Sequence, residues 1–349
     1  MKKLRVGIIG AGNIACGAHL PAYKLLKDKI EVVAIADIVR ERAENAAKSY
    51  GIPNVYSSVY ELLENCDVDY VDICTWNAGH HECAIAAARA GKHILCEKPM
   101  ADTLEHALLM QEEIKKAGVK FMLGVVTRFY PEVKLAKEMQ EAGEMGDIYF
   151  AKTAYTRRRG TPIGWFTDKS SSGGGAVIDI GVHCIDRTWY LMGRPKPVSV
   201  SAVVGNRFGD FKTRGVNRWH GYESNGAFDT DDAGTAFIRF ENGACMTAEV
   251  AWAQNGLPEQ FTVIYGTKAG ASFTPDAPLT VYGENKYQYL TDEVLNAGAK
   301  SEFRDEIAHF ADCIVEDKQP LAPTEDGVTV QRILDAIYRS SEEGREIIL

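Results

Sequence analysis

The sequence of 349 residues has no long apolar run and no excess of basic residues. Because no segment is apolar for long enough to cross a bilayer, we expect no membrane-spanning helix. The formal net charge is −9 at pH 7, which argues against nucleic acid or an anionic membrane as the main partner. The start, Met-Lys-Lys-Leu-Arg-Val, leads into a glycine-rich turn without a cleavage-type site, so we expect no signal peptide and a cytoplasmic protein.

The sequence also lacks any Cys-x-x-Cys pair, although it contains eight cysteines. They are scattered, most lie in apolar surroundings, and none clusters with histidine at a ligand spacing. We therefore expect reduced thiols, no structural zinc and no bound metal. Repeats and low-complexity tracts are missing as well. A chain of this length exceeds one compact core, so two domains are expected.

A glycine-rich motif follows the first apolar run. Residues 4–9 predict a buried strand, and Gly10-Ala-Gly12-Asn13-Ile14-Ala15 follows it directly. In the pattern G-x-G-x-x-A the first glycine makes the turn and the second lets a pyrophosphate approach the backbone. The small third residue lets the helix pack closely on the sheet. This loop predicts a dinucleotide cofactor, with contacts from Gly10, Gly12, Asn13 and Ile14.

A carboxylate ends the second predicted strand, residues 31–36, at Asp37. Its distance from the glycine motif suits an acid that binds the adenosine ribose hydroxyls. A carboxylate there repels a 2′-phosphate, so we predict NAD as the cofactor. Arg40 and Arg42 follow closely and leave NADP use open.

Helices and strands then alternate to about residue 125. This order predicts a doubly wound parallel sheet, in which ligands lie beyond the carboxyl ends of the strands. Strands are expected at 54–56, 70–75, 93–96 and 120–125, and helices at 43–50, 59–65, 81–90 and 104–117. The polar residues that follow strands, and are expected to line one crevice, are Thr75, Asn77, Glu97, Lys98 and Arg128.

The segment Gly173–Asp186 carries the clearest catalytic signal. Three glycines precede a predicted helix, and on that helix Asp179 and His183 are four residues apart, so they share one face. A carboxylate beside an imidazole can move a proton near neutral pH. The competing interpretation is a satisfied structural pair.

At Glu97-Lys98-Pro99 the chain resembles the Gfo/Idh/MocA family of oxidoreductases. The resemblance covers nearly the whole chain, and its motifs occur in the family's order. They are the glycine motif with Asp37, Thr75-x-Asn77-x-x-His80, the run from Ala90 to Pro99, the Gly173–Asp186 segment and the C-terminal stretch Gly327–Arg345. It implies an α/β fold with an N-terminal Rossmann domain over 1–125. An α+β domain over 126–349, with a large open and mostly antiparallel sheet, is implied to follow.

The second half fits that implication. Strands are predicted at 148–159, 198–204, 234–240, 244–252 and 260–265, with a hairpin signal between the third and fourth. The C-terminal helix over 325–343 is expected to pack back toward the first domain. The family's use of the outer sheet face implies a homodimer or homotetramer.

The resemblance implies that Lys98, Asp179 and His183 form the catalytic group and that His80 joins the cofactor-binding residues. The residue chemistry agrees, because alcohol oxidation needs a base such as His183 for the hydroxyl proton. Lys98 would stabilise the developing alkoxide, and Asp179 would orient the substrate or His183.

Three further residues are candidate substrate contacts. Tyr155 and Arg157 share one strand face and suit substrate hydroxyls, although a solvated strand end or a subunit contact explains them equally. Trp165 suits stacking on a sugar or on the nicotinamide, with core packing as the competitor. Arg128 is expected to point into the crevice, and a salt-bridged hinge residue is the competing interpretation. The loop 205–232, with Trp219, His220 and Tyr222, is interpreted as a lid or an oligomer arm.

The leading functional hypothesis is an NAD-dependent dehydrogenase for a ring secondary alcohol of a sugar, cyclitol or glycoside. A second is a redox-neutral glycosidase that oxidises a sugar carbon transiently, eliminates the glycosidic substituent and returns the hydride. A third is a non-catalytic NAD-responsive regulatory protein.

Overall fold

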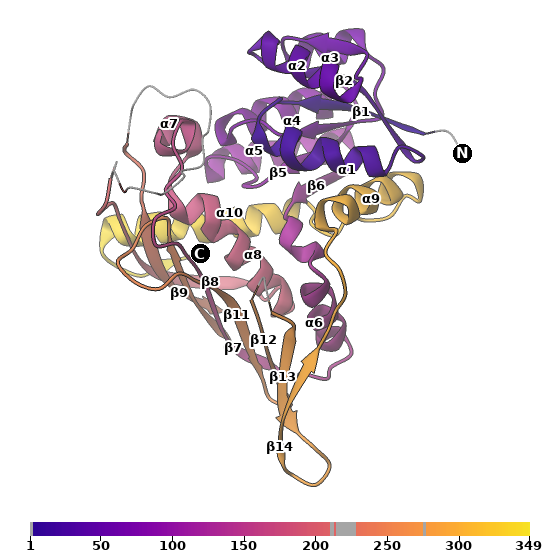
Figure 1. Ribbon diagram of the computed structural model, residues 1–349. Coiled ribbons are helices and arrows are strands. Elements are labelled where there is room, and N and C mark those ends of the chain that lie inside the picture. The colour runs from indigo at the N-terminus through magenta and orange to yellow at the C-terminus, as the bar shows by residue number, and fades with distance from the viewer. Residues whose placement is uncertain (1–2, 210–212, 214–227, 275–276) are drawn as a thin grey trace. The chain divides into compact units, whose positions relative to one another are not determined.

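The computed structural model describes residues 3–209, 213, 228–274 and 277–349. The chain divides into two compact units (Figure 1). Unit 1 comprises Met1–Val126, Ser170–Gly173 and Ser301–Gln331, and unit 2 comprises Thr127–Lys169, Gly174–Lys300 and Arg332–Leu349. Most of the loop 205–232, including Trp219, His220 and Tyr222, lies outside the described residues.

Unit 1 is built on a six-stranded parallel sheet in the order β3-β2-β1-β4-β5-β6. The strands are β1 (Leu4–Ile9), β2 (Ile30–Ala36), β3 (Asn54–Tyr56), β4 (Tyr70–Ile73), β5 (His93–Glu97) and β6 (Phe121–Gly124). This is the order of the doubly wound dinucleotide-binding fold, so the predicted Rossmann sheet is confirmed.

Helices connect these strands and lie on the sheet; α4 and α5 lie side by side in Figure 1. They are η1 (Ala15–His19), α1 (Leu20–Leu25), α2 (Arg40–Tyr50), α3 (Val59–Asn65), η2 (Asn77–Gly79), α4 (His80–Arg89) and α5 (Leu104–Ala117). Local chemistry sets their ends: Ser58 and Thr103 accept N-terminal backbone N–H groups with their hydroxyls. Pro21 falls in the first turn of α1, directly after η1, and the Cys16 carbonyl of the preceding turn accepts the Tyr50 hydroxyl over 2.7 Å.

One segment departs from a simple cut near residue 125. Residues 301–331, expected in the second domain, belong to unit 1. They include α9 (Glu302–Val315), whose Phe310 packs edge-on against Tyr70 of β4 at 5.5 Å between ring centroids. The Leu123 backbone N–H also donates to the Ala322 carbonyl over 2.9 Å. Apolar packing thus outweighs chain order in deciding which unit holds this segment.

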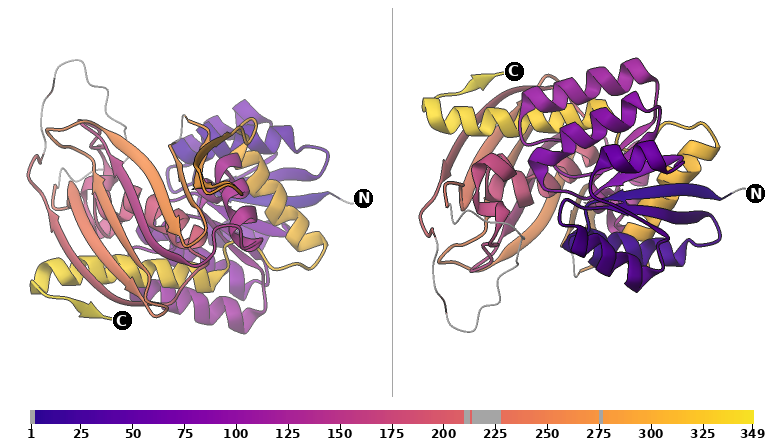
Figure 2. Two further views of the ribbon diagram at one scale, coloured as in Figure 1. Left: turned by 90° about the horizontal axis from the view of Figure 1, so that it is seen from below. Right: turned by 90° about the horizontal axis from the view of Figure 1, so that it is seen from above.

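Unit 2 contains a nine-stranded sheet in the order β14-β13-β12-β11-β7-β10-β9-β8-β15, whose twist is visible in Figure 2. Its strands are β7 (Ile148–Thr156), β8 (Pro197–Gly205), β9 (Ala233–Phe240), β10 (Cys245–Ala251), β11 (Glu259–Gly266), β12 (Gly270–Phe273), β13 (Leu279–Glu284), β14 (Leu290–Leu295) and β15 (Ile347–Ile348). Neighbours pair antiparallel except β7 with β10, so the mostly antiparallel sheet is confirmed.

The remaining helices include α8, which packs on β7 and β11 along one face of this sheet (Figure 1). They are η3 (Val126–Phe129), α6 (Pro131–Glu141), η4 (Trp165–Thr167), α7 (Lys169–Ser172), η5 (Val177–Gly181), α8 (Val182–Leu191) and α10 (Thr324–Glu343). Of these, the sequence predicted only the region of η5 and α8 and the C-terminal helix. Among the described residues, no helix has both the length and the apolarity needed to cross a membrane.

Candidate active site

The glycine-rich loop of unit 1 has the geometry that its motif predicts. Gly10 has φ +98°, and a Cβ there would lie 2.7 Å from the Cys74 carbonyl oxygen, so both backbone angle and space require glycine. A Cβ on Gly12 would meet no atom within 4 Å. Ala15 is fully buried. The open space beside Gly12 fits a group that approaches the backbone closely, as a pyrophosphate does.

Asp37 lies beside this loop. One carboxylate oxygen accepts the Ala11 N–H over 2.7 Å, and the other accepts the Val39 N–H over 2.8 Å. Arg40 pairs with Glu44 at 2.9 Å. The strand-end carboxylate is thereby held against the turn that the cofactor would bind, which fits NAD.

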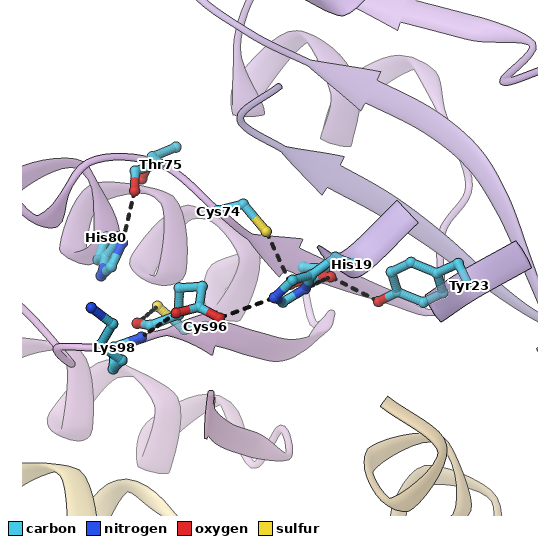
Figure 3. A network of polar contacts seen from close by, with 9 residues as sticks. His19, Tyr23, Cys74, Thr75, His80, Cys96 and Lys98 are labelled. Carbon is cyan, nitrogen blue, oxygen red and sulfur yellow. Dashed lines mark hydrogen bonds and ion pairs between the residues drawn. The ribbon is translucent and has the colours of Figure 1, made fainter. Parts of the chain in front are cut away.

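His80 lies between the loop after β4 and the loop after β5, and Figure 3 shows its contact with Thr75. Its Nδ1 lies 2.8 Å from the Pro99 carbonyl oxygen and its Nε2 lies 3.2 Å from that of Thr75. Burial lowers the pKa of this imidazole. A neutral ring has one N–H, and the shorter contact assigns it to Nδ1 and Pro99. The hydrogen bond from Nδ1 therefore fixes the Pro99 backbone, next to Lys98.

Two other polar residues after strands are buried. The Asn77 side chain donates to the Ser172 carbonyl over 2.7 Å, and the Glu97 carboxylate contacts His19 at 3.0 Å. Both are at most 6% exposed. Lys98 and Thr75 are half-buried. Of the predicted crevice residues in unit 1, Lys98 and Thr75 therefore have the exposed surface that a ligand contact needs. The side chains of Asn77 and Glu97 instead make hydrogen bonds to backbone groups.

The triple glycine in front of Asp179 is required by close packing. A Cβ on Gly174 would collide with the Tyr338 hydroxyl, and one on Gly175 would collide with the Asp231 backbone. Asp231 accepts the N–H groups of Gly175 and Val177 with its carboxylate, at 2.6 and 2.9 Å. It also accepts the Tyr338 hydroxyl over 2.8 Å. A buried carboxylate thus caps the start of the helical segment.

Only two side chains of this segment reach the surface. Between Gly174 and Met192 every residue is buried except Asp179 and His183, which are half-exposed. Asp179 lies in the π-helical turn η5 and His183 in the first turn of α8. Single π-helical turns inside helices recur at functional sites. The arrangement presents one carboxylate and one imidazole from an otherwise buried segment.

Trp252 holds Asp179 in place. Its indole Nε1 donates to Asp179 Oδ2 over 2.9 Å, and the tryptophan is fully buried. Arg157 lies near the same carboxylate: burial lowers the pKa of its guanidinium, but Tyr155 and Asp179 raise it by more. Arg157 also donates to the Tyr155 hydroxyl over 3.0 Å. Tyr155 and Arg157 thus form a pair near Asp179, and both remain proposed substrate contacts.

Arg128 has a structural partner. Its guanidinium makes two hydrogen bonds to the Asp186 carboxylate, at 2.9 and 2.6 Å, and both residues are 0% exposed. The salt-bridge interpretation accounts for Arg128, because a fully buried guanidinium needs a buried carboxylate. Trp165 stacks on Phe166 with ring centroids 3.9 Å apart, as the packing interpretation expects, and remains half-exposed.

Tertiary structure also gathers His81, Asp102 and His106, which no spacing in the sequence indicated. His106 Nδ1 lies 2.6 Å from Asp102 Oδ1, and the two imidazoles stack at 3.8 Å with an interplanar angle of 13°. A metal lies close to the plane of each imidazole that binds it. Nearly parallel stacked rings do not converge on one such point, so these rotamers suit a stacked pair better than a shared ion.

Sequence reasoning missed Trp252 and Asp231. Trp252 was the last residue of a predicted strand, and Asp231 lay in a polar loop. Their partners are 73 and 56 residues away, at Asp179 and Gly175, so no local pattern connected them. A tryptophan that ends a strand, with an N–H to satisfy, was the one available signal.

Comparison with known proteins agrees with this geometry. Residues 4–125 match the family profile described as "Oxidoreductase family, NAD-binding Rossmann fold", and residues 133–272 match "GFO/IDH/MocA C-terminal domain". D-glucoside 3-dehydrogenase of Escherichia coli (strain K12) is 30% identical over 352 residues, which cover 99% of this chain and 97% of that protein. Levoglucosan dehydrogenase of Pseudarthrobacter phenanthrenivorans is 34% identical over 290 residues, covering 78% of this chain and 74% of that protein.

A solved structure of a levoglucosan dehydrogenase in complex with NADH has the same fold. It is 28% identical, the TM-score is 0.88, and 99% of each chain is covered. Because the two profiles together match most of the sequence and both domains agree in fold, the chain belongs to the Gfo/Idh/MocA family of NAD-binding oxidoreductases.

Proposed function

We propose that this protein is an NAD-dependent dehydrogenase that acts on a ring secondary alcohol of a sugar, cyclitol or glycoside. The observation that carries the proposal is the exposure of Asp179 and His183 alone within the buried stretch 174–192. The relatives named as glucoside and levoglucosan dehydrogenases support the substrate class.

In the proposed reaction, the Gly10–Ala15 loop and Asp37 would hold NAD, which when bound would supply the acceptor for the hydride of the alcohol carbon. His183 takes the hydroxyl proton, since histidine ordinarily titrates near neutral pH. Asp179, oriented by Trp252, holds the substrate hydroxyl or the imidazole. Lys98 supplies the cation that stabilises negative charge on the alcohol oxygen. The alcohol leaves as a ketone, and one proton is released.

The test is incubation of the purified protein with NAD and a panel of monosaccharides, inositols and glycosides. NADH and product masses are followed together. The proposal expects NADH and a product lighter by two hydrogens. Cleaved glycoside without net NADH would indicate the redox-neutral glycosidase instead. Tight NAD binding with no turnover on any compound would indicate the regulatory protein.

Variants then assign the residues. Replacing a positioned acid–base group costs about 10²–10⁴ in turnover, so His183→Ala and Lys98→Met are each expected to lose that much. His93→Ala, at the other end of β5 from Glu97, is the control. Turnover within a few-fold of wild type in His183→Ala would reject its assignment.

We further propose that the chain forms a homodimer or homotetramer through the large sheet. Apolar side chains are exposed on β13 and β14: Tyr282 is 42%, Leu290 85% and Val294 65% exposed. Light scattering after size exclusion measures the assembly. Leu290→Asp is expected to lower the mass if this face is the interface, and an unchanged mass would place the contact elsewhere.

A further inference from the structure

Unit 1 contains a buried group of ionisable side chains that the proposed mechanism does not use (Figure 3). His19, the last residue of η1, lies between two carboxylates: Nδ1 is 2.7 Å from Asp72 Oδ2 and Nε2 is 3.0 Å from Glu97 Oε1. The Tyr23 hydroxyl donates to the same Asp72 oxygen over 2.9 Å. His19 and Asp72 are both 0% exposed.

The geometry fixes the charge of His19. Each ring nitrogen faces a carboxylate oxygen, so both carry a proton and the ring is an imidazolium. Burial by itself lowers the pKa of His19, but Asp72 and Cys74 outweigh it and hold that pKa well above the usual value. Asp72 and Glu97 thus share one buried cation between them, which offsets one of their two negative charges.

Glu97 connects this cation to Lys98. Its Oε1 contacts His19, and its Oε2 accepts the backbone N–H of Lys98 over 3.1 Å. Gly124 of the neighbouring strand leaves room for that carboxylate, since a Cβ there would lie 3.3 Å from Glu97 Oε1 and 3.2 Å from its Cα. The carboxylate is therefore fixed at both oxygens, and the backbone of Lys98 is fixed with it.

Glu306 of α9 completes the group. It is fully buried, and its carboxyl lies with His19 and Glu97 in a cluster whose potential ligand atoms are all within 4.8 Å of one another. Within the described part of the chain, neither of its oxygens has a hydrogen-bond partner. Burial raises the pKa of Glu306 and Glu97 raises it further, so the carboxyl is a neutral acid. It lies beside the His19–Glu97 contact without adding a third negative charge to those of Asp72 and Glu97.

We propose that His19 is a positioning residue for Lys98, acting through the two oxygens of Glu97. The inference rests on the proposed function, in which Lys98 stabilises the charge on the alcohol oxygen. Without the imidazolium, Asp72 and Glu97 would be buried anions without a cation, and one would take a proton or turn away. The N–H of Lys98 would then lose its acceptor. A catalytic group displaced by about 1 Å can cost about 10²-fold in rate.

Two substitutions separate this role from a general effect on packing. In His19→Gln, the side-chain amide nitrogen can take the place of Nε2 and donate to Glu97. In His19→Asn, the amide nitrogen takes the place of Nδ1 and can donate only to Asp72. We expect kcat to fall about 10–100-fold in His19→Asn and clearly less in His19→Gln, with the NAD dissociation constant within threefold of wild type. His93→Asn is the matched control, because Asn can accept the Lys120 N–H that His93 Nδ1 accepts over 3.0 Å.

A second readout needs no substrate. The rate at which the Lys98 amine is reductively methylated, followed by peptide mass spectrometry, is expected to change at least threefold in His19→Asn and to stay unchanged in His93→Asn. If wild type turns over no compound but the Lys98 rate responds, the proposed function fails and the positioning role stands. Equal kcat in both His19 variants and wild type, with equal Lys98 rates, would overturn the inference.

Gly124→Ala keeps the inference open to test if both His19 variants unfold. Its methyl group would lie 3.2 Å from the Cys96 carbonyl oxygen and 3.3 Å from Glu97 Oε1, so it presses on Glu97 from β6. The positioning role expects a fall in kcat and a changed Lys98 methylation rate in this variant too. A folded Gly124→Ala protein with wild-type values of both quantities would reject the role.

Discussion

Trp252 donates its indole N–H to Asp179 over 2.9 Å, although the two residues are 73 positions apart. The bond comes from the residue that follows β10 and reaches a residue of the π-helical turn η5. A hydrogen bond to a charged group contributes about 1.5–3 kcal/mol. Trp252 therefore has a defined effect on how Asp179 is held.

Trp252→Phe tests that effect. We expect kcat/KM to fall about tenfold or more, because the phenyl ring keeps the packing and loses the donor. Steady-state kinetics measure it. Trp189→Phe is the matched control, since Trp189 is also buried and donates its indole N–H to the Pro195 carbonyl over 2.8 Å. Equal losses in the two variants would show that the effect comes from packing alone.

Raising the pH is expected to lower the stability of unit 1. The pKa values of Glu306 and His19 are both raised in the folded protein. A raised folded pKa means that stability is complete below the unfolded pKa and is lost as pH rises through the folded pKa. The loss for Glu306 begins above about pH 4.3 and that for His19 above about pH 6.5. Between its unfolded and its folded pKa, each group lowers the free energy of unfolding by up to about 1.4 kcal/mol per pH unit.

Glu306→Gln isolates one of these groups. Glutamine keeps the shape of the side chain and stays neutral. The free energy of unfolding of the variant minus that of wild type is therefore expected to increase from pH 5 to pH 8. Urea unfolding at several pH values gives the two curves. Curves that run parallel over this range would mean that Glu306 is ionised in the folded protein.

Asp37 is expected to select NAD over NADP. Its carboxylate lies at the turn that Gly10 and Ala11 form, where a 2′-phosphate would meet negative charge. We expect Asp37→Asn to weaken NAD binding about tenfold or more and to lower the ratio of the affinity for NAD to the affinity for NADP. Titration calorimetry at fixed salt measures both affinities, with Glu31→Gln at the exposed start of β2 as the control. Similar wild-type affinities for the two cofactors would contradict this role.

Cys184 is expected to resist alkylation although it follows His183 directly. It is fully buried, and burial raises the pKa of its thiol to about 11. The reactive thiolate is then about a thousandth of the total at pH 8. Peptide mass spectrometry after iodoacetamide treatment should find the half-exposed Cys245 labelled long before Cys184. Early labelling of Cys184 in the folded protein would show that its surroundings open.

Local sequence determined the elements of this protein. Apolar runs gave the parallel strands nearly to the residue, and β3, α3 and α5 have the predicted bounds, because backbone hydrogen bonding and side-chain spacing act over a few residues. The glycine motif, Asp37, Lys98 and the Asp179–His183 pair were equally visible, since each lies within one short segment. The short strands β12 to β14 and the helix α9 were missed, because their apolar patterns are brief or incomplete.

Tertiary structure decided which side chains meet. Arg128 follows a strand as a crevice residue would, yet it pairs with Asp186 because a buried guanidinium needs a counterion. His19 meets Glu97 across 78 residues, and Glu306 joins them from a segment that packs into unit 1 against the order of the chain. Such pairings depend on where whole elements pack, and no periodicity within an element carries that information.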